Sequence, residues 1–450
     1  MKRIIFSFSF FLFFILVVYS TGQTQEIRKF SLKEAQLYAL ENNYDVKNAL
    51  TDIEIAKKKV KENLAIGFPQ VNASANYNNN IELPTTLIPG EFFGAPGEDM
   101  EIQFGTQHNA AWGADLNQII FSGEYIVGVM ASKSYVGLIE TNYEKSEIEI
   151  KDAISKAYYP VIILQENKKV FDSTLSSLND MLYDTEEYYK SGFVEDTDVD
   201  QLKLLISDME TTITNIDNQL EIAYNMLKYQ MGIKAEEDIE ITDKLEDVLA
   251  EVNRTYLLNT SFDYNNHIDY KILKSQEEMA LLQLKLNKSE YFPSLVGFYS
   301  YQQNAMRDKF NFFASDKKWF TNQMLGVQLN VPILSSGNRK NKVAQAKLNL
   351  EKIKVMDDQL QQGLSLKVKT KKSEFNNAYM IYVNKKTSIS IAENIYNKTK
   401  IKYREGLSTS LDLSQTYNQY LNTQIQYLAS ILDLLIKKSE LEKELTKVNY

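Results

Sequence analysis

One stretch of this chain is too long to fit as a helix inside a globular domain. Residues 339–403 form a 65-residue run without proline and with a single glycine, Gly363. At about 1.5 Å per residue, a continuous helix of this length would extend for roughly 100 Å. Such length is typical of a coiled coil rather than of a globular helix. Apolar residues recur along it at three- and four-residue intervals and predict a helix–helix seam that Asp357 interrupts: Ala346, Leu350, Ile353, Leu360 and Leu364.

The chain also repeats itself. A Phe-Pro pair at 68–69 recurs at 292–293, an offset of 224 residues, and the segment 116–122 recurs at 329–335, an offset of 213. A Tyr-x-x-Gly turn at 189–192 recurs at 403–406, an offset of 214. Three matches in the same order indicate a duplication in which each half reads helix, strand, loop, strand, long helix, turn and helix. We therefore expect structural repeats at 23–231 and 262–450, a linker at 232–261, and a kink or break in the first long helix at Pro160.

Four segments that are poor in charge and rich in strand formers separate the helices, at about 70–79, 109–121, 294–303 and 322–334. Apolar and polar residues alternate in them, which is typical of transmembrane β-strands but also of a half-buried sheet packed on helices. On the membrane hypothesis, one face would contact lipid through Trp112, Ala114, Leu116, Leu325, Val327 and Leu329. The other face would line a water-filled lumen through Asp115, Asn117, Gln328 and Asn330.

Four strands are too few to close a barrel, because about eight is the smallest usual number. Unpaired edges are not tolerated in lipid, so several chains would have to pool their strands, and three chains would supply about twelve. Flanking aromatic residues favour membrane strands, since such residues gather at membrane interfaces: Tyr77, Tyr299, Tyr301, Trp319 and Phe320. The connecting loops, at 79–109 and 304–318, are then expected on the outer side of the membrane.

The N-terminus has the pattern of an export signal. Lys2 and Arg3 precede an uncharged apolar run at 4–18, and small residues follow at Ser20 and Gly22. We expect residues 1–22 to be a cleaved signal peptide. The alternative is a single membrane anchor helix, which usually needs about 20 apolar residues.

The composition excludes many kinds of site. The chain has no cysteine and two histidines that lie far apart, which excludes thiolate chemistry, disulfides and a multi-histidine metal site. Its formal charge of −9 disfavours nucleic acid as a partner. Phosphate-binding and dinucleotide motifs are absent, and neither His108 nor His267 lies in a nucleophile motif. We therefore predict that the chain is not an enzyme and holds no cofactor or metal.

The duplicated order, the Phe-Pro boundary before each first strand and the repeated Tyr-x-x-Gly turn resemble the TolC-like outer-membrane efflux family. The resemblance runs from Ser31 to the last helix. It implies a mainly helical homotrimer in which duplicated coiled coils form a periplasmic α-barrel and four strands per chain contribute to a shared twelve-stranded transmembrane β-barrel. It also implies the outer membrane of a Gram-negative bacterium, contact with its lipid, and docking to a periplasmic adaptor (membrane fusion) protein and an inner-membrane RND or ABC transporter.

The resemblance further implies a functional role for the helical turns. A periplasmic aperture would be ringed by Asp412, with Gln415 in a place where the family has a second aspartate and Asp198 in the first half. Contacts with the adaptor would fall on the two turns, at Tyr189, Gly192, Phe193, Tyr403, Gly406 and Leu407. The residues themselves leave a second interpretation open, because Thr409 and Asp412 also have capping-box spacing, and Asp198 fits a solvated acidic turn.

The function most consistent with these features is a passive outer-membrane exit channel of a tripartite efflux or type I secretion system. The alternative from a different class is a soluble periplasmic coiled-coil scaffold or adaptor. The two-faced strands speak against that alternative. A secreted hydrolase ranks lower still, because neither histidine lies in a nucleophile context. The sequence does not identify the cargo, the pump or the adaptor.

Overall fold

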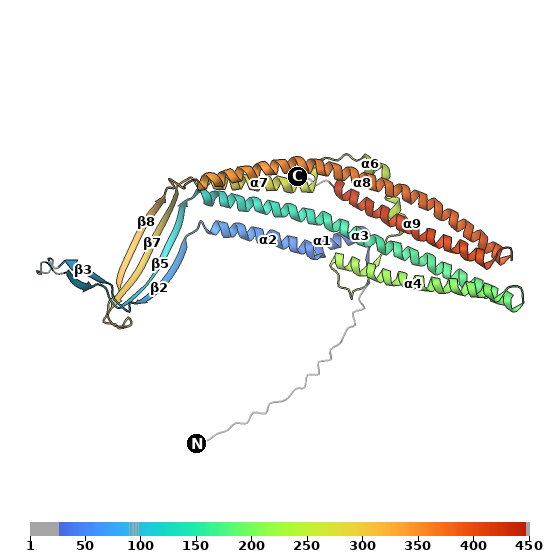
Figure 1. Cartoon of the computed structure of the whole chain (residues 1–450), viewed down its shortest axis with the longest axis horizontal. Helices are drawn as coiled ribbons and strands as arrows, with labels where there is room; N and C mark the ends of the chain where they lie inside the picture. The colour runs from blue at the N-terminus through green and yellow to red at the C-terminus, as the bar shows by residue number, and fades with distance from the viewer. Residues whose placement is uncertain (1–26, 90, 92–93, 95–96, 98, 447–450) are drawn as a thin grey trace, which may run out of the picture.

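A computed structural model describes residues 27–89, 91, 94, 97 and 99–446. The predicted signal peptide lies outside the described residues. The molecule is elongated, with a small β-sheet at one end, long helices running away from it, and two helical turns at the far end (Figure 1). None of the described helices has both the length and the hydropathy needed to cross a membrane.

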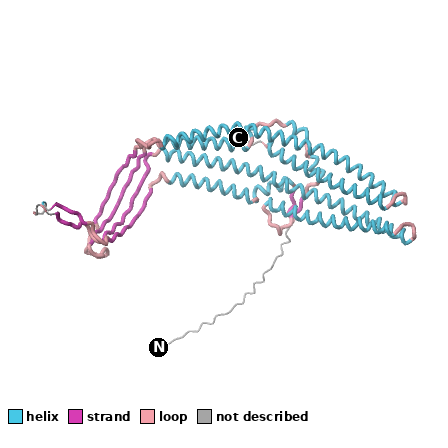
Figure 2. The backbone as a smooth tube through the Cα atoms, in the orientation of Figure 1, coloured by secondary structure: helices cyan, strands magenta, loops and turns pink. Residues whose placement is uncertain are grey.

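The two halves follow the same order, as the duplication predicts. In the first half the elements are α1 (Leu32–Asn42), α2 (Tyr44–Ala65), β2 (Gln70–Asn79), β5 (His108–Phe121), α3 (Gly123–Lys190) and α4 (Asp196–Met231). In the second half they are α7 (Ile268–Ser289), β7 (Ser294–Arg307), β8 (Phe320–Asn330), α8 (Asn338–Arg404) and α9 (Ser410–Leu445). The mainly helical fold class with a small β part is therefore confirmed (Figure 2).

Smaller elements fill the gaps between these. A hairpin of β3 (Thr85–Pro89) and β4 (Asp99–Gln103) extends the loop between β2 and β5. The segment expected as a linker contains β6 (Ile239–Ile241), α5 (Leu245–Ala250) and α6 (Arg254–Asn259), and η2 (Tyr264–Asn266) follows. Strand β6 pairs in parallel with β1 (Arg28–Phe30), so two segments more than 200 residues apart in the sequence lie side by side.

The long helices are continuous. Helix α8 has 67 residues, and α3 has 68 residues and runs through Pro160 instead of ending there. A proline inside a helix costs roughly 3 kcal/mol. The flanking residues are among the most buried of the chain, including Tyr158, Tyr159 and Val161, so packing offsets that cost.

Asp357, which interrupts the seam in the sequence, forms a salt bridge of 2.8 Å from its carboxylate to the ammonium group of Lys274 on α7.

The four long strands form one antiparallel sheet in the order β2-β5-β7-β8. Residues directly opposite each other in the ladder share a face. The register therefore places Trp112, Ala114, Leu116, Leu325, Val327 and Leu329 on one face, with Val71, Tyr299 and Tyr301. It places Asp115, Asn117, Gln328 and Asn330 on the other face, with Asn72 and Ser300. Strands β2 and β8 are the edges, and neither has an outer partner among the described residues.

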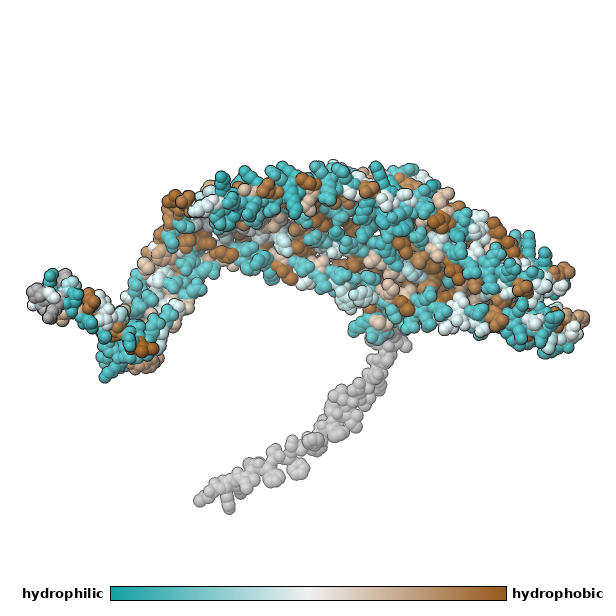
Figure 3. Space-filling view, in the orientation of Figure 1, coloured by the Kyte–Doolittle hydropathy of each residue, from teal (hydrophilic) through white to brown (hydrophobic). Residues whose placement is uncertain are grey.

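Strand ends differ slightly from the expected bounds. Strand β8 covers 320–330 instead of 322–334, because Pro332 has no N–H with which to continue the ladder. Strand β7 reaches Arg307 instead of 303, since the longer β5 supplies partners as far as His108. Exposed apolar residues gather where the helices meet the sheet, including Phe68, Phe292, Ile333 and Leu334 (Figure 3).

The largest apolar cluster of the described residues lies midway along the helices. There α1, α3, α4 and α9 enclose a cluster that contains Ala35, Ile154, Leu227 and Ile431. The hydroxyl of Tyr158 donates to the carbonyl oxygen of Phe30 at 2.9 Å, which ties α3 to the β1–β6 pair. A second cluster lies nearer the turns, between the α3–α4 hairpin and the α8–α9 hairpin.

A charged network joins α3, α8 and α9 beside this core. The carboxylate of Glu440 contacts the ammonium groups of Lys371 at 2.9 Å, Lys156 at 3.3 Å and Lys437 at 3.4 Å. Burial raises the pKa of Glu440, but Lys371 and Lys156 outweigh burial and lower it to about 2 from an ordinary 4.5. The ionised form of Glu440 is therefore more stable in the folded protein than in the unfolded chain, and this difference stabilises the fold.

We expect Glu440→Gln to remove a stabilisation of about 1–3 kcal/mol near pH 7, because Lys371 and Lys156 then each lose one of their two carboxylate partners. In the parent protein this contribution is complete above about pH 4.5 and is lost as the pH falls toward 2. Thermal unfolding in detergent across this range should show a shallower acid limb for the variant. Glu393→Gln, on an exposed part of α8, is the matched control. Equal acid limbs for parent and Glu440→Gln would contradict the assignment.

Candidate functional site: the two helical turns

Both long helices end in the same kind of turn. After α3, the N–H of Gly192 donates to the carbonyl of Tyr189 at 2.9 Å, and that of Phe193 to Tyr188 at 3.0 Å. After α8, the N–H of Gly406 donates to the carbonyl of Tyr403 at 3.0 Å, and that of Leu407 to Lys402 at 2.7 Å. This pair of bonds is the Schellman motif, which needs a left-handed residue at the glycine position. Gly192 and Gly406 have φ of 77° and 70°, so the repeated Tyr-x-x-Gly pattern has a conformational cause.

The helices that leave the turns begin with acidic caps. In α9, Oδ2 of Asp412 accepts from the hydroxyl of Thr409 at 2.8 Å and from its backbone N–H at 3.2 Å, and the N–H of Asp412 donates to the Thr409 hydroxyl at 3.1 Å. These bonds lower the pKa of Asp412 below its ordinary value. In α4, Oδ2 of Asp198 accepts from the N–H of Glu195 at 3.2 Å. The structure therefore confirms that Asp412 forms a capping box with Thr409.

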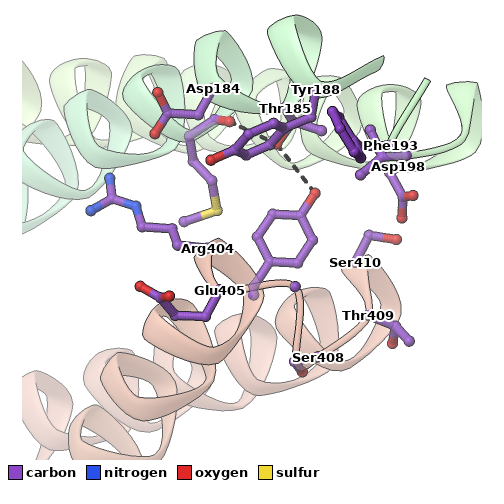
Figure 4. Close-up of a pocket in the computed structure, with 14 residues that line it drawn as sticks. Asp184, Thr185, Tyr188, Phe193, Asp198, Arg404, Glu405, Ser408, Thr409 and Ser410 are labelled. Atoms are coloured by element: carbon purple, nitrogen blue, oxygen red, sulfur yellow. Dashed lines mark hydrogen bonds between the residues drawn. The ribbon is translucent and has the colours of Figure 1, made fainter. Parts of the chain in front are cut away.

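A cavity of about 590 Å³ lies between the two turns (Figure 4). The α3–α4 hairpin contributes Asp184, Thr185, Tyr188, Phe193 and Asp198, and the α8–α9 hairpin contributes residues 403–406 and 408–410. Asp198 thus faces the second hairpin, whereas Asp412 and Gln415 are exposed on α9 and do not line the cavity.

One polar contact joins the hairpins across this cavity. The hydroxyls of Thr185 and Tyr403 lie 3.2 Å apart (Figure 4). Thr185 donates its only hydroxyl hydrogen to the carbonyl of Met181 at 2.8 Å, so Tyr403 is the donor in the contact between the hairpins. Burial and the nearby charge of Asp198 raise the pKa of Tyr403, which keeps this donor protonated.

Two further tyrosines between the hairpins are buried without a partner for their hydroxyls. Tyr417 is 1% exposed and Tyr396 is 5% exposed, and their rings lie 5.8 Å apart. Neither hydroxyl forms a hydrogen bond within the described structure. A buried unpaired hydroxyl costs about 1–3 kcal/mol. The packing between the hairpins therefore leaves two buried hydroxyl groups without a hydrogen bond in the described structure.

The outermost points of the turns are apolar. Phe193 is 80% exposed and Leu407 is 77% exposed, each directly after its glycine. In a Schellman motif this position usually packs back onto the preceding helix turn. Here Leu407 is mostly exposed to solvent, and so is Phe193, although Phe193 also borders the cavity between the turns. About half of Tyr189 is exposed as well.

The structure also shows residues that the sequence analysis missed. Thr185 lies four residues before Tyr189 and therefore on the same face of α3, which is the one signal that could have identified it. Asp184 and Arg404 had no signal apart from their nearness to the motif. The two histidines have structural contacts. Nδ1 of His267 accepts the N–H of Asp269 at 3.2 Å, and its Nε2 lies 3.5 Å from the carboxylate of Glu444 on α9. His108 contacts the Tyr77 hydroxyl at 2.9 Å.

This arrangement agrees with comparisons to known proteins. A model of the outer membrane efflux protein family matches residues 38–232 and 272–445. The chain belongs to the outer membrane efflux protein family. Its members are channel proteins and not enzymes, and such channels work as trimers together with an adaptor and an inner-membrane pump. The search among curated proteins gave no match.

Solved structures of such channels have the same fold at low sequence identity. The chain is similar to CusC, with a TM-score of 0.70, 14% identity, and coverage of 93% of this chain and 92% of that one. It is similar to VceC of Vibrio cholerae, with a TM-score of 0.65, 15% identity, and coverage of 92% and 96%. It is similar to the open state of MtrE of Neisseria gonorrhoeae, with a TM-score of 0.68, 15% identity, and coverage of 92% and 88%.

The two tyrosines of the repeated motif make a matched pair for mutation in this efflux protein. We expect Tyr403→Phe to destabilise the folded protein by about 0.5–1.5 kcal/mol, because it removes the hydrogen bond to Thr185. We expect Tyr189→Phe to have almost no effect, because that side chain is 48% exposed. Thermal unfolding in detergent measures both. Equal effects would show that the contact between the hairpins contributes nothing.

Proposed function

We propose that three copies of this chain assemble into a passive exit duct of a tripartite efflux or type I secretion system, opened when an adaptor and a pump dock. Membership of the efflux family and the channel fold speak against the alternative of a soluble scaffold. The observation that carries the proposal is the sheet. It has one mainly apolar face, one mainly polar face that also holds Val296, Phe298 and Met324, and two edges without an outer partner among the described residues.

The two faces fit a shared barrel. The apolar face would contact lipid through Trp112, Leu116 and Leu325, and the polar face would line a lumen through Asp115, Asn117, Gln328 and Asn330. Backbone groups at the edges β2 and β8 would each cost several kcal/mol if left unpaired in lipid. Pairing β2 of one copy with β8 of the next removes both edges, and three copies supply twelve strands.

The helical turns fit a docking surface and a gate. Exposed Phe193 and Leu407, held by Gly192 and Gly406, offer paired apolar contacts to a periplasmic adaptor. The contact between Thr185 and Tyr403 would hold the hairpins together in one state of the duct. In a trimer, Asp412 would form a carboxylate ring on α9, with Gln415 one turn further and Asp198 between the hairpins. A carboxylate ring favours cations and repels anions at a constriction.

Disulfide trapping tests the shared sheet. Because the chain has no cysteine, introduced pairs report only on themselves. We expect Gln328→Cys on β8, combined in turn with Asn72→Cys, Ser74→Cys or Asn76→Cys on β2, to give covalent trimers on a denaturing gel for at least one pair. Each single-cysteine variant is the control and should stay monomeric on the gel. Failure of every pair to crosslink would reject the β2–β8 seam.

Conductance in planar bilayers tests the gate. We expect Asp412→Asn to weaken blockade by a multivalent cation about tenfold or more, because a ring of three charges is lost. Thr409→Ala is the matched control, since it removes the capping bond but keeps the carboxylate. If the two variants conduct and block alike, Asp412 acts only as a helix cap.

A further inference from the structure

The loop between β7 and β8 folds back over the apolar face of the sheet, at the end away from the helices. Phe310 and Phe312 of this loop pack edge-on against Tyr77 of β2, with ring centroids 5.5 Å and 5.9 Å apart. Phe312 is buried and also contacts Trp319, whereas Phe313 next to it is 92% exposed. The loop thus crosses from β7 to the opposite edge strand.

An apolar cavity of about 390 Å³ lies beneath this loop. Its lining includes Ala75, Tyr77, Ala110 and Trp112 from the sheet, and Phe312 and Trp319 from the loop. The volume lies within the range of about 300–1,000 Å³ that is typical of ligand sites. The cavity opens on the face that carries Leu116 and Leu325, so it continues the surface assigned to lipid.

The loop carries charged residues next to those that line the cavity: Lys309 precedes Phe310, and Lys318 precedes Trp319. Its acids are Asp308 and Asp316, and Asp316 pairs with Lys317 at 3.6 Å. Arg307 pairs with His108 in the ladder, which places it on the same face, and Lys309, Lys317 and Lys318 follow in the loop. Arg307 donates through Nη2 to the carbonyl of Lys318 at 2.7 Å, while its Nε is buried without a partner in the described structure. Lys309 and Lys318 are exposed, and β8, which a neighbouring copy would bring alongside, has no charged residue.

We propose that this cavity binds a phosphorylated, acylated lipid of the outer leaflet. An acyl chain would lie between Tyr77, Trp112 and Phe312, and a phosphate would lie against the exposed lysines. Lysine ammonium groups at a membrane surface attract anionic headgroups. The hairpin of β3 and β4 differs in charge, because it carries acids such as Asp99 and Glu101 and residues 63–132 contain no lysine or arginine. The inference rests on the proposed function only in placing these loops at the outer leaflet.

Tryptophan fluorescence gives a direct test. The chain has two tryptophans, Trp112 and Trp319, and both line the cavity. Brominated dodecyl maltoside should quench them in the purified trimer. We expect added diphosphoryl lipid A to restore the fluorescence saturably, whereas phosphatidylcholine at the same concentration restores little.

Two variants distinguish the contribution of the lysine charges to lipid binding from the contribution of the apolar cavity. Lys309→Gln with Lys318→Gln should raise the lipid A concentration for half recovery about 10- to 30-fold. Lys340→Gln with Lys347→Gln, at the opposite end of the sheet on α8, is the matched control and should change nothing. Ala110→Leu should abolish recovery while leaving the lysines in place, because the larger side chain fills the cavity.

Several results would overturn the proposal. Equal recovery with phosphatidylcholine would mean general bilayer contact, and no recovery with lipid A would mean no site. Tryptophans quenched in dissociated monomers but protected in trimers, whatever the lipid, would mean that a second copy covers the cavity. Disulfide trapping and conductance on the same preparation keep the two proposals apart. Conducting trimers that ignore lipid A defeat only this inference, whereas a failure to form trimers defeats the proposed function.

Discussion

Unpaired backbone groups at the two edges of a four-stranded sheet constrain everything else in this protein. Strands β2 and β8 are 10 and 11 residues long, and each leaves a full row of N–H and C=O groups without a partner in the described chain. In water such an edge is a liability, and in lipid it is not tolerated. In the proposed assembly, copies of the chain share these edges, and the two-faced strands then separate lipid from lumen. The helices that continue from the strands must then also be arranged around a common axis.

The contacts between the helices differ along their length. Midway, a wide apolar core and the charged network around Glu440 join α3, α8 and α9, and this packing holds α3 helical through Pro160. Near the turns, the hairpins meet through a cavity, one hydroxyl contact and two unpartnered tyrosine hydroxyls. Regions with fewer satisfied contacts open at lower free energy. This difference supports the proposal that the gate of the duct lies at the turns.

Much of the fold was predictable because its elements are local and repeated. Period-two alternation predicted the faces of β5 and β8, and the Tyr-x-x-Gly pattern predicted both turns, where the glycine adopts a left-handed conformation. Capping-box spacing also gave the bonds of Asp412. The site was less accessible. Thr185 meets Tyr403 across 218 positions of sequence, and no local pattern marks that pairing. The small sheet of β1 and β6 was missed for the same reason, because three-residue strands carry too little periodicity to detect.

The sequence by itself determined the repeat, the length of α8, the faces of β5 and β8 and the two turns, because each depends on residues within a few positions of one another. Tertiary structure decided which helices pack together, which tyrosine of the repeated motif forms a bond, and where the loop after β7 lies. Those outcomes depend on contacts between residues far apart in the chain. Phe312 illustrates the difference: in the sequence it is one of several loop aromatics, and only the folded sheet places Tyr77 beneath it.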